Sequence, residues 1–416
     1  MNIVDINLIK QIYGADNTEL HIERINNLIN FYNNTFSKKD DINIFSVSGR
    51  IEVSGNHTDH QLGNVLCASI SMDKLCVCSK RNDNLIILHS EGYEPLTVDV
   101  IDTAYRKEEE NTSLALIRGV CNRFKEKGYT LGGFSACVAS NVPGGSGMSS
   151  SASFEGLVGN ILNYFYCDKK ESQVEIAKTG QYAENVYFGK PSGLMDQIAC
   201  VVGGFVHIDF YDKENPIIEK IDSTIISNDY DICIIDTGDK HNDLTDEYAN
   251  ITKEMLEVAN YFGETYLSRV SEEDFIANIP NLRKTISDRA VVRALHFFTD
   301  NNHVKMQVEA LKNKNVEEFL SLVNASGNSS VLNLQNIFST KEVEVQGSTL
   351  VISLCKKFLN GKGAVRIHGG GFGGTVQAFV PRAMTNEFKE KMEKVVGKNK
   401  CYVLSIRNIE GTRIEQ

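Results

Sequence analysis

The sequence contains no tryptophan and only six prolines among its 416 residues, and aromatic residues make up 8%. With 32 glycines against so few prolines, we expect glycine to supply most of the tight turns. Hydrophobic residues reach 42% and charged residues 23%, which are ordinary values for a globular protein and exclude a disordered chain. Because the chain is about three times as long as a typical domain, it is expected to form at least two lobes.

Long apolar segments and paired cysteines are also missing. No run of 18 apolar residues occurs, and the first residues, MNIVDINLIKQIYG, lack the layout of a secretory signal. The ten cysteines include no Cys-x-x-Cys pair, so neither a zinc ribbon nor a thioredoxin-like site is indicated. Reduced, buried thiols in apolar runs such as LCVC and SACVA are typical of a cytoplasmic enzyme.

Acidic residues outnumber basic ones by 54 to 43, which gives a formal net charge of −11. This excess opposes sequence-independent binding to nucleic acid and to membrane surfaces. It does not oppose a local basic pocket for a phosphorylated ligand. No feature of the sequence indicates an obligatory protein partner.

The period of the hydrophobic residues changes along the chain. Alternation from Phe45 to Val53 predicts a half-buried strand. Ser172 and Glu175 form a capping box that predicts the start of a helix ending near Gly189. Residues 243–330 follow the helical period. The change from strand-rich to helix-rich sequence places a domain boundary near residue 205, with domains over 1–205 and 206–416.

The strongest signal for a phosphate-binding loop is PGGSGMSSSAS, residues 143–153. The glycines let the backbone approach a ligand, and the free N–H groups of the helix that follows would face an anion. The serines add hydroxyl groups for phosphate or for a magnesium ion. The segment is not a Walker A loop, because it contains no lysine. A glycine-rich turn whose serines only cap the helix is the alternative at this point.

Polar and acidic side chains gather in GRIEVSGNHTDHQLG, residues 49–63. A carboxylate such as Asp59 accepts two hydroxyl protons at once, so the loop suits a polyhydroxylated ligand. A solvated hairpin loop is the alternative. A metal site on His57 and His60 is not favoured, because no further His or Cys lies nearby at ligand spacing.

Two more segments have unusual composition. GKPSGLMDQIACVVGG, residues 189–204, places Asp196 at the start of a predicted helix, where an acid ordinarily interacts with the helix dipole. Glu184, on the preceding helix, would ordinarily be a surface acid. HGGGFGGT, residues 368–375, holds five glycines around Phe372, which indicates either a second phosphate-facing loop or a tightly packed structural turn.

In this order, the four segments resemble the motifs of the galactokinase branch of the GHMP small-molecule kinases. The family's first motif reads approximately GRVNLIGEHTDYxxG and its second PxGxGLSSSAS, while CGIMDQ is matched by SGLMDQ at 192–197. The motif GGGFGG stands intact at 369–374, and DEYANITKEM resembles a tyrosine-containing helix of the family. The resemblance spans roughly residues 43 to 405. It implies an α+β fold of two lobes with the active site in the cleft between them.

The resemblance also implies an ATP- and Mg²⁺-dependent kinase that converts galactose to galactose 1-phosphate. Asp196 matches the catalytic base, and Arg50 matches the arginine that stabilises the transferring phosphoryl group and keeps the acid ionised. The magnesium ligands match Ser151 and Glu184, both hard oxygen donors. The positions that match the ATP triphosphate loop are Gly144, Gly145, Ser146, Gly147, Met148, Ser149, Ser150 and Ser151. The positions that match sugar contacts are Asn56, His57, Asp59, Gly193 and Tyr248.

Among the departures from the family motifs, Asn56 stands for Glu, His60 for Tyr, Ser192 for Cys and Ser48 for Pro. In the family the first of these binds the sugar C6 hydroxyl. Exchanging its carboxylate for an amide removes on the order of 1 kcal/mol of binding energy. We therefore expect galactose to remain the best substrate with a raised KM, and Asn56→Glu to lower that KM.

Two alternatives stay open from the sequence. One is a kinase for a related hexose, such as N-acetylgalactosamine or galacturonate, since Asn56 lacks the charge that would repel a sugar acid. The other is a non-catalytic sensor that binds galactose and ATP. The undamaged serine loop, together with Asp196 and Arg50, favours catalysis.

Overall fold

The computed structural model describes residues 4–37, 41–144, 147–222, 224–239 and 244–414. The chain forms two compact units. Unit 1 consists of Met1–Arg50, Ala68–Gly204 and Ile406–Gln416, and unit 2 of Ile51–Cys67 and Phe205–Ser405. Two long strands, β1 (Asn43–Ser54) and β2 (Asn64–Lys80), contribute to both.

The sequence predicts two contiguous domains, over 1–205 and 206–416. In the structure, residues 51–67 lie in unit 2 and residues 406–416 in unit 1. The chain passes from unit 1 to unit 2 at Gly204–Phe205. Residues 51–67 belong to unit 2 because β1 and β2, with 12 and 17 residues, are much longer than ordinary strands. Residues 406–416 belong to unit 1, where the last strand pairs with β1.

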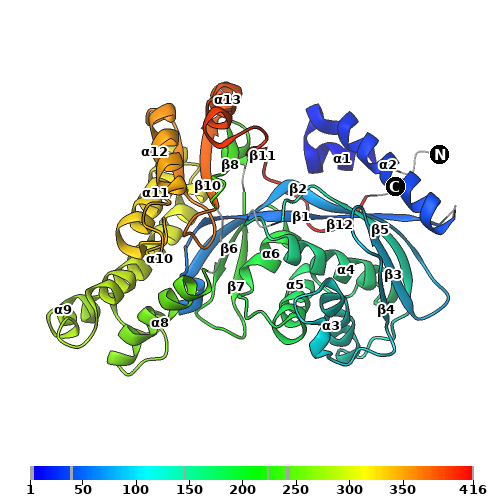
Figure 1. The fold of residues 1–416 in the computed structure, drawn as a ribbon, viewed down its shortest axis with the longest axis horizontal. Helices are drawn as coiled ribbons and strands as arrows, with labels where there is room; N and C mark the ends of the chain where they lie inside the picture. The colour runs from blue at the N-terminus through cyan, green and yellow to red at the C-terminus, as the bar shows by residue number, and fades with distance from the viewer. Residues whose placement is uncertain (1–3, 38–40, 145–146, 223, 240–243, 415–416) are drawn as a thin grey trace. The chain divides into compact units, whose positions relative to one another are not determined.

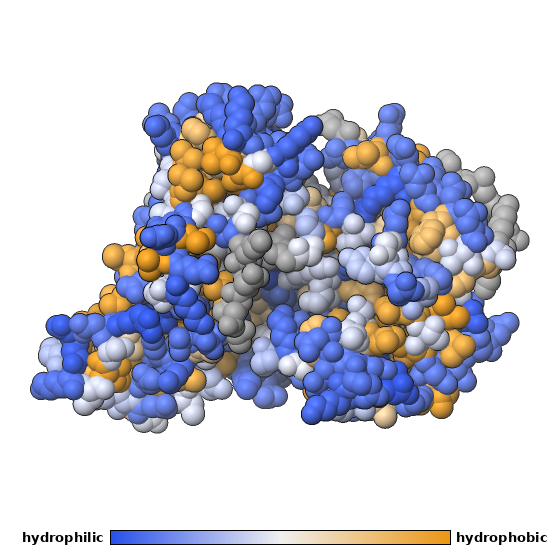
Figure 2. Space-filling model, in the orientation of Figure 1, coloured by the Kyte–Doolittle hydropathy of each residue, from blue (hydrophilic) through white to orange (hydrophobic). Residues whose placement is uncertain are grey.

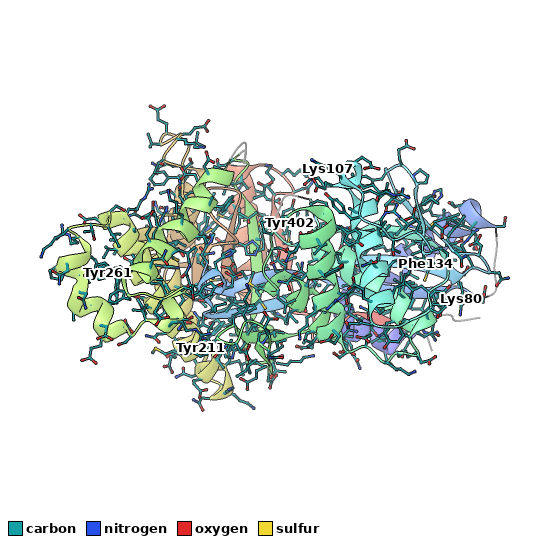
Figure 3. The ribbon with its side chains drawn as sticks, turned by 90° about the horizontal axis from the view of Figure 1, so that it is seen from below. Lys80, Lys107, Phe134, Tyr211, Tyr261 and Tyr402 are labelled. Atoms are coloured by element: carbon teal, nitrogen blue, oxygen red, sulfur yellow. The ribbon has the colours of Figure 1, made fainter. Side chains whose placement is uncertain are left out.

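Unit 1 is built on a sheet with the strand order β12-β1-β2-β5-β3-β4. Most neighbours are antiparallel, as in the pairing of β2 with β5, while β3 and β5 are parallel. Lys80 on β2 pairs with Phe134 on β5, and the two residues lie near each other in Figure 3. Phe134 is fully buried, and the ammonium group of Lys80 lies 4.5 Å from the ring centroid of Tyr166. The remaining strands are β3 (Leu85–Ser90), β4 (Leu96–Asp99), β5 (Phe134–Ser140) and β12 (Thr412–Arg413).

Helices cover both faces of this sheet (Figure 1). Helices α1 (Ile6–Tyr13) and α2 (Thr18–Phe36) lie on one face, where Ile12, Ile25 and Tyr32 pack with strand residues such as Val77. On the other face lie α3 (Ser113–Glu126), α4 (Ser150–Tyr166), α5 (Gln173–Tyr182) and α6 (Met195–Val202), with a π-helical turn, η4 (Ala183–Phe188), after α5. The side chain of Ser172 caps α5 by accepting from Glu175 N at 3.3 Å, which confirms the predicted start of this helix.

Unit 2 contains an antiparallel sheet with the order β11-β8-β10-β9. Its apolar side chains pack with those of α12 and α13, among them Cys355 and Met392. A hairpin of β6 and β7 pairs with β2. The strands are β6 (Phe205–Asp209), β7 (Ile217–Ile221), β8 (Tyr230–Asp236), β9 (Ala364–Ile367), β10 (Thr375–Pro381) and β11 (Cys401–Leu404).

The helical stretch expected over 243–330 is confirmed in unit 2. Its helices share an apolar core that includes Met255, Phe275 and Phe297. The helices of the unit are α7 (Thr224–Ser227), α8 (Thr245–Tyr261), α9 (Glu272–Leu282), α10 (Asp288–Lys312), α11 (Val316–Ser329), α12 (Gly347–Leu359) and α13 (Thr385–Val396), with a π-helical turn, η6, at Ser330–Leu334. Helices beside mainly antiparallel sheets confirm the α+β class.

The prediction of a half-buried strand over Phe45–Val53 is wrong, because both faces of β1 are buried. Its polar residues are accommodated by hydrogen bonds, as when Ser48 Oγ donates to the carbonyl of Cys200 at 2.8 Å. The expectation of reduced, buried thiols is confirmed, since all ten cysteines are buried and none forms a disulfide. On the face shown in Figure 2, polar residues cover most of the surface and apolar residues lie in separate groups. Within the described ranges, no helix has the length and hydropathy to span a bilayer.

A buried ion-pair network that the sequence does not reveal fastens the N-terminal helices of unit 1. Asp73 on β2 is fully buried and accepts from Tyr13 Oη at 2.5 Å, from Arg24 Nη1 at 2.5 Å and from Ser46 Oγ. The buried guanidinium of Arg407 lies 3.9 Å from the same carboxylate. Burial alone would raise the pKa of Asp73, but the two arginines outweigh it and lower that pKa.

Candidate functional site

Arg50 and Asp196, which the resemblance matches to the catalytic pair, lie together in unit 1. The Arg50 guanidinium donates from Nε to Asp196 Oδ1 and from Nη2 to Oδ2, both at 2.8 Å. Asp196 also accepts from Ser149 Oγ, and Arg50 Nη1 donates to the carbonyl of Gly147. Burial alone would raise the pKa of Asp196, but the charge of Arg50 and the hydrogen bond from Ser149 lower it. The carboxylate is therefore ionised at neutral pH.

The serine loop leads directly into α4. Ser149 is the N-cap residue of this 17-residue helix but has a left-handed backbone, with φ 55°, and its side chain does not cap the helix. Its hydroxyl donates instead to Asp196. The alternative that the serines serve only as caps is thus wrong for Ser149. Without a side-chain cap, the N-terminus of α4 offers N–H groups and the positive end of the helix dipole to an anion.

The loop backbone is held against the start of the first motif. Arg50 N donates to the carbonyl of Met148 at 3.2 Å, and a Cβ atom at Gly49 would lie 2.9 Å from the same oxygen. The glycine before Arg50 is therefore needed for this close approach. Gly144 and Ser150 are described, whereas Gly145 and Ser146 lie outside the described residues.

Glu184 is buried in the π-helical turn η4, so its interpretation as a surface acid is wrong. Its Oε1 accepts from Ser151 Oγ at 3.2 Å and from Lys190 Nζ at 3.1 Å. Its Oε2 accepts from Ser192 Oγ at 2.7 Å and from Gln197 Nε2 at 2.8 Å. Ser192, which stands where the family motif has Cys, therefore supplies a donor to this carboxylate. Both Ser192 and Gln197 belong to the SGLMDQ motif, so the sequence had marked this segment as part of the candidate site.

The donors Ser151 and Glu184 fit a magnesium ion chemically, because hydroxyl and carboxylate oxygens are its preferred protein ligands. A Mg²⁺ ion bound through one or two protein groups keeps the rest of its shell for water and phosphate oxygens. No group of three or more His, Cys, Asp or Glu that could hold a metal occurs in the described part of the chain.

Glu155 on α4 is a second buried acid, which the sequence analysis missed. Gln197 Nε2 donates to Glu155 Oε2 at 3.2 Å, so one amide joins Glu155 to Glu184. Burial, and after it the negative charge of Glu184, raises the pKa of Glu155 well above its usual value. The folded chain therefore favours the protonated, neutral form of Glu155. The serine motif does not indicate that this acid is buried.

We expect Glu155→Gln to stabilise unit 1 more at pH 8 than at pH 5. A raised pKa in the folded state gives stability that is complete below the unfolded pKa of about 4.3 and is lost as the pH rises through the folded pKa. Glutamine does not ionise, so the variant does not lose stability in this way as the pH rises. Urea unfolding at both pH values measures the effect, with Asp168→Asn, whose side chain is 84% exposed, as the control. A stability difference that is independent of pH would contradict the prediction.

Four of the five positions matched to sugar contacts lie in unit 2, and Gly193 lies in unit 1. The carbonyls of three successive glycines accept from three of these four: Gly369 from Asn56 Nδ2 at 2.7 Å, Gly370 from His57 Nε2 at 3.0 Å, and Gly371 from Tyr248 Oη at 3.1 Å. The fourth, Asp59, begins a short 3₁₀ turn and accepts from His60 N at 2.9 Å. The polar loop and the glycine segment thus form one assembly within unit 2.

The glycine segment is tightly packed. A Cβ atom at Gly370 would lie 2.5 Å from Tyr248 Cε1, and one at Gly371 would lie 2.2 Å from the carbonyl oxygen of Asn336. Gly371 also has a φ of +88°, which a side chain would strain. Of the two interpretations of this segment, the structural turn is the one that the packing supports.

His57 and Asn56 are both buried, with different consequences. Burial, and after it the neighbouring His60, lowers the pKa of His57 to about 4, so its ring is neutral at physiological pH. Because a carbonyl only accepts, His57 Nε2 carries the proton and Nδ1 is left as an acceptor. Asn56, by contrast, has a protein partner at each end of its amide: Nδ2 donates to Glu52 as well as Gly369, and Oδ1 accepts from Asn336.

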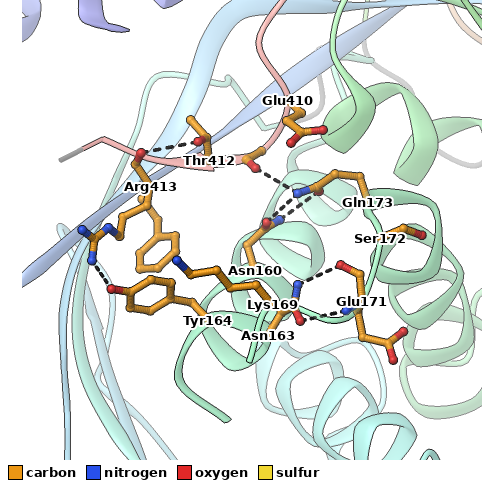
Figure 4. A pocket seen from close by; sticks show the side chains of 12 residues that line it. Asn160, Asn163, Tyr164, Lys169, Glu171, Ser172, Gln173, Glu410, Thr412 and Arg413 are labelled. Carbon is orange, nitrogen blue, oxygen red and sulfur yellow. Dashed lines mark hydrogen bonds between the residues drawn. The ribbon is translucent and has the colours of Figure 1, made fainter. Parts of the chain in front are cut away.

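A separate cavity of about 520 Å³ lies in unit 1, beside α4 and the C-terminal strand (Figure 4). Its polar side chains largely bond one another, as when Gln173 Nε2 donates to Asn160 Oδ1 at 2.8 Å. Lys169 and Arg413 both lie near the ring of Tyr164, at 4.8 Å and 4.7 Å from its centroid. None of the motif residues lines this cavity.

Comparison with known proteins shows that the segments with the serine loop and with the polar loop both match models of the same family. The profile described as GHMP kinases N terminal domain matches residues 115–204, and that described as galactokinase galactose-binding signature matches residues 30–80. The chain is 30% identical over 365 residues to a galactokinase of Clostridium tetani, covering 85% of this chain and 89% of the relative. It has the same identity and coverage with a galactokinase of Lactobacillus helveticus.

Solved structures show the same similarity. The galactokinase of Lactococcus lactis, solved in complex with galactose, is 25% identical with a TM-score of 0.79, covering 93% of this chain and 99% of that one. The mevalonate kinase of Methanococcus jannaschii is 16% identical with a TM-score of 0.62, covering 89% and 99% of the two chains, and shares the fold alone. The expected GHMP kinase fold is thereby confirmed.

Proposed function

The chain belongs to the galactokinase family, and from this membership we propose that it transfers the γ-phosphoryl group of ATP to the anomeric hydroxyl of galactose. The products are galactose 1-phosphate and ADP. The observation that carries the proposal for this chain is the ion pair of Arg50 with Asp196 beside the serine loop. A sensor that binds without catalysis would have no need for this paired, ionised acid.

Asp196 acts as the general base in this proposal. As the anomeric oxygen forms its bond to phosphorus and the bond to the bridging oxygen of ADP breaks, the hydroxyl proton passes to the Asp196 carboxylate. Arg50 remains charged throughout, so it stabilises negative charge on the transferring group while holding Asp196 in place. The N-terminus of α4 and the loop over 144–151 bind the phosphates.

Ser151 and Glu184 would hold the magnesium ion, which neutralises phosphate charge when bound. Lys190, whose side chain is 56% exposed, donates from Nζ to Glu184 Oε1 at 3.1 Å. An exposed ammonium group on a flexible stem is free to exchange that carboxylate for a phosphate oxygen.

We expect Ser151→Ala to raise the Mg²⁺ concentration needed for half-maximal activity, with a smaller effect on the KM for the sugar. The substitution removes one hard oxygen donor and the hydrogen bond to Glu184. Mg²⁺ titrations of initial rate at saturating sugar measure it, and Ser353→Ala is the control, because Ser353 is an exposed serine of α12 whose hydroxyl donates to the carbonyl of Thr349 at 2.8 Å. Equal changes in both constants would remove Ser151 from the metal site.

The sugar is held in this proposal by His57, Asp59 and Tyr248 of unit 2, together with Gly193. The neutral His57 ring offers Nδ1 as an acceptor for a hydroxyl group, and Asp59 offers a carboxylate. The test compares kcat/KM for galactose, N-acetylgalactosamine and galacturonate. Galactose is expected to rank first. A different leading sugar would assign the chain to a related hexose kinase.

A further inference from the structure

Glu52 and Asn56 form a buried hydrogen-bonded pair at the base of the polar loop in unit 2. Glu52 is 5% exposed and Asn56 fully buried. Glu52 Oε1 accepts from Asn56 Nδ2 at 2.8 Å and from Arg366 Nη2 at 3.2 Å. The Arg366 guanidinium is itself fully buried and donates from Nη1 to the carbonyl of Val53 at 2.6 Å. One acid, one amide and one guanidinium thus share an interior site.

Set against the motif GRVNLIGEHTDY, the two departures in this pair are reciprocal. Glu52 stands where the motif has Asn, and Asn56 stands where the motif has Glu. The acid and the amide have exchanged places, and the number of acidic groups beside Arg366 is unchanged. Because Glu52 and Asn56 touch each other, the exchange keeps both the hydrogen bond and the charge balance.

We propose that Glu52 and Asn56 work as one exchanged pair, in which Glu52 supplies the buried carboxylate and Asn56 is a positioning residue for the sugar loop. In what it says about galactose, this inference rests on the proposed function. Asn56 does not bind the sugar directly. It fastens the loop that carries His57 and Asp59 to the glycine segment.

The bonds of Asn56 carry this assignment. Both amide protons are used, one by Glu52 Oε1 and one by the carbonyl of Gly369. Its Oδ1 accepts from Asn336 Nδ2 at 2.6 Å, and Asn336 also donates to the carbonyl of Gly370 at 3.0 Å. A sugar hydroxyl that needed a donor from Asn56 would have to break one of these buried bonds. Each bond leads instead to a segment that frames the loop.

Charge also opposes an acid at position 56 in this chain. Asn56→Glu would place a second carboxylate within hydrogen-bond distance of Glu52, with Arg366 as the common partner. It would also turn an acceptor toward the carbonyl of Gly369. Two like charges and two facing acceptors in a buried site are unfavourable. The effect of Asn56→Glu alone is therefore opposite to the gain expected from the family motif.

The first test is a cycle of four proteins: wild type, Asn56→Glu, Glu52→Asn and the double variant. Galactose binding is measured by calorimetry without ATP, and unfolding is followed in urea. Each single variant is expected to weaken galactose binding by roughly tenfold or more, since each leaves a buried charge unbalanced. The double variant should return to within about threefold of wild type, because it restores the pair in the other order. Single effects that simply add in the double variant would overturn the inference.

The second test separates positioning from direct contact. In Asn56→Ala, affinities for galactose and for 6-deoxygalactose should fall by the same factor, so that their ratio stays at the wild-type value. Asn336→Ala, which removes a partner of Asn56, should behave in the same way. A ratio that moves toward one in Asn56→Ala alone would show that Asn56 contacts the C6 hydroxyl, and would overturn the positioning role.

The two proposals fail in different ways. If wild type binds no galactose, the proposed substrate is wrong, and the urea cycle still decides the exchanged pair. Recovery of the unfolding midpoint in the double variant would support the pair in that case as well. Absence of recovery would overturn it, whatever sugar the protein uses.

Discussion

Asp196→Asn is expected to keep the fold and ATP binding while lowering kcat by about 10²–10⁴, the usual contribution of a positioned general base. The amide has nearly the same shape, and its oxygen still accepts from Arg50, but it cannot take the proton of the attacking hydroxyl. Steady-state rates at saturating galactose and ATP, with nucleotide affinity measured separately, provide the test. Turnover near the wild-type value would exclude Asp196 from the proton transfer.

The surface offers a matched control for this substitution. Arg283 Nε donates to Asp288 Oδ1 at 2.7 Å in a pair whose aspartate side chain is 67% exposed. Asp288→Asn removes the same charge beside an arginine and should leave kcat unchanged. Because the pKa of Asp196 is lowered, protonation of this group should reduce kcat/KM only below the usual aspartate pKa of about 3.9. A loss of kcat/KM near neutral pH would then belong to another group.

The second large effect is on stability. Asp73→Ala should lower the free energy of unfolding of unit 1 by about 3–5 kcal/mol, the usual cost of removing one partner from a buried ion pair. The fully buried guanidinium of Arg407 and the partly buried one of Arg24 would lose their common carboxylate. Urea unfolding at pH 7 measures the change. Asp83→Ala, which breaks an exposed pair with Arg81, should change little.

The difference in unfolding free energy between wild type and Asp73→Ala should depend on pH. Since the folded pKa of Asp73 is lowered, its stabilising contribution is complete above the unfolded pKa and is lost as the pH falls through the folded pKa. The gap between wild type and Asp73→Ala should therefore narrow in strong acid. A gap that is small at pH 7 would mean that the network contributes little to stability.

Much of the candidate site could be predicted from the sequence, because its motifs contain glycines where the backbone needs them. The glycines of PGGSGMSSSAS and GGGFGG mark positions where the chain approaches another segment closely, as at Gly371 against Asn336. The order of four motifs was enough to indicate the family, which the relatives confirm. The helices over 243–330 followed from their period alone.

Tertiary structure alone decided which partners these residues have. Asp196 meets Arg50 across 146 positions of the chain, Arg407 meets Asp73 across more than 300, and no local pattern encodes either pair. Burial was equally inaccessible, as for Glu155 in a serine-rich helix. Asn56 is the sharpest case. The presence of Asn in place of Glu at this position predicted weaker binding of the sugar. The hydrogen bonds of Asn56 with Glu52 and Gly369 support a role in positioning the sugar loop instead. A sequence specifies what each residue is able to bond, and folding determines which of those bonds remain available to a ligand.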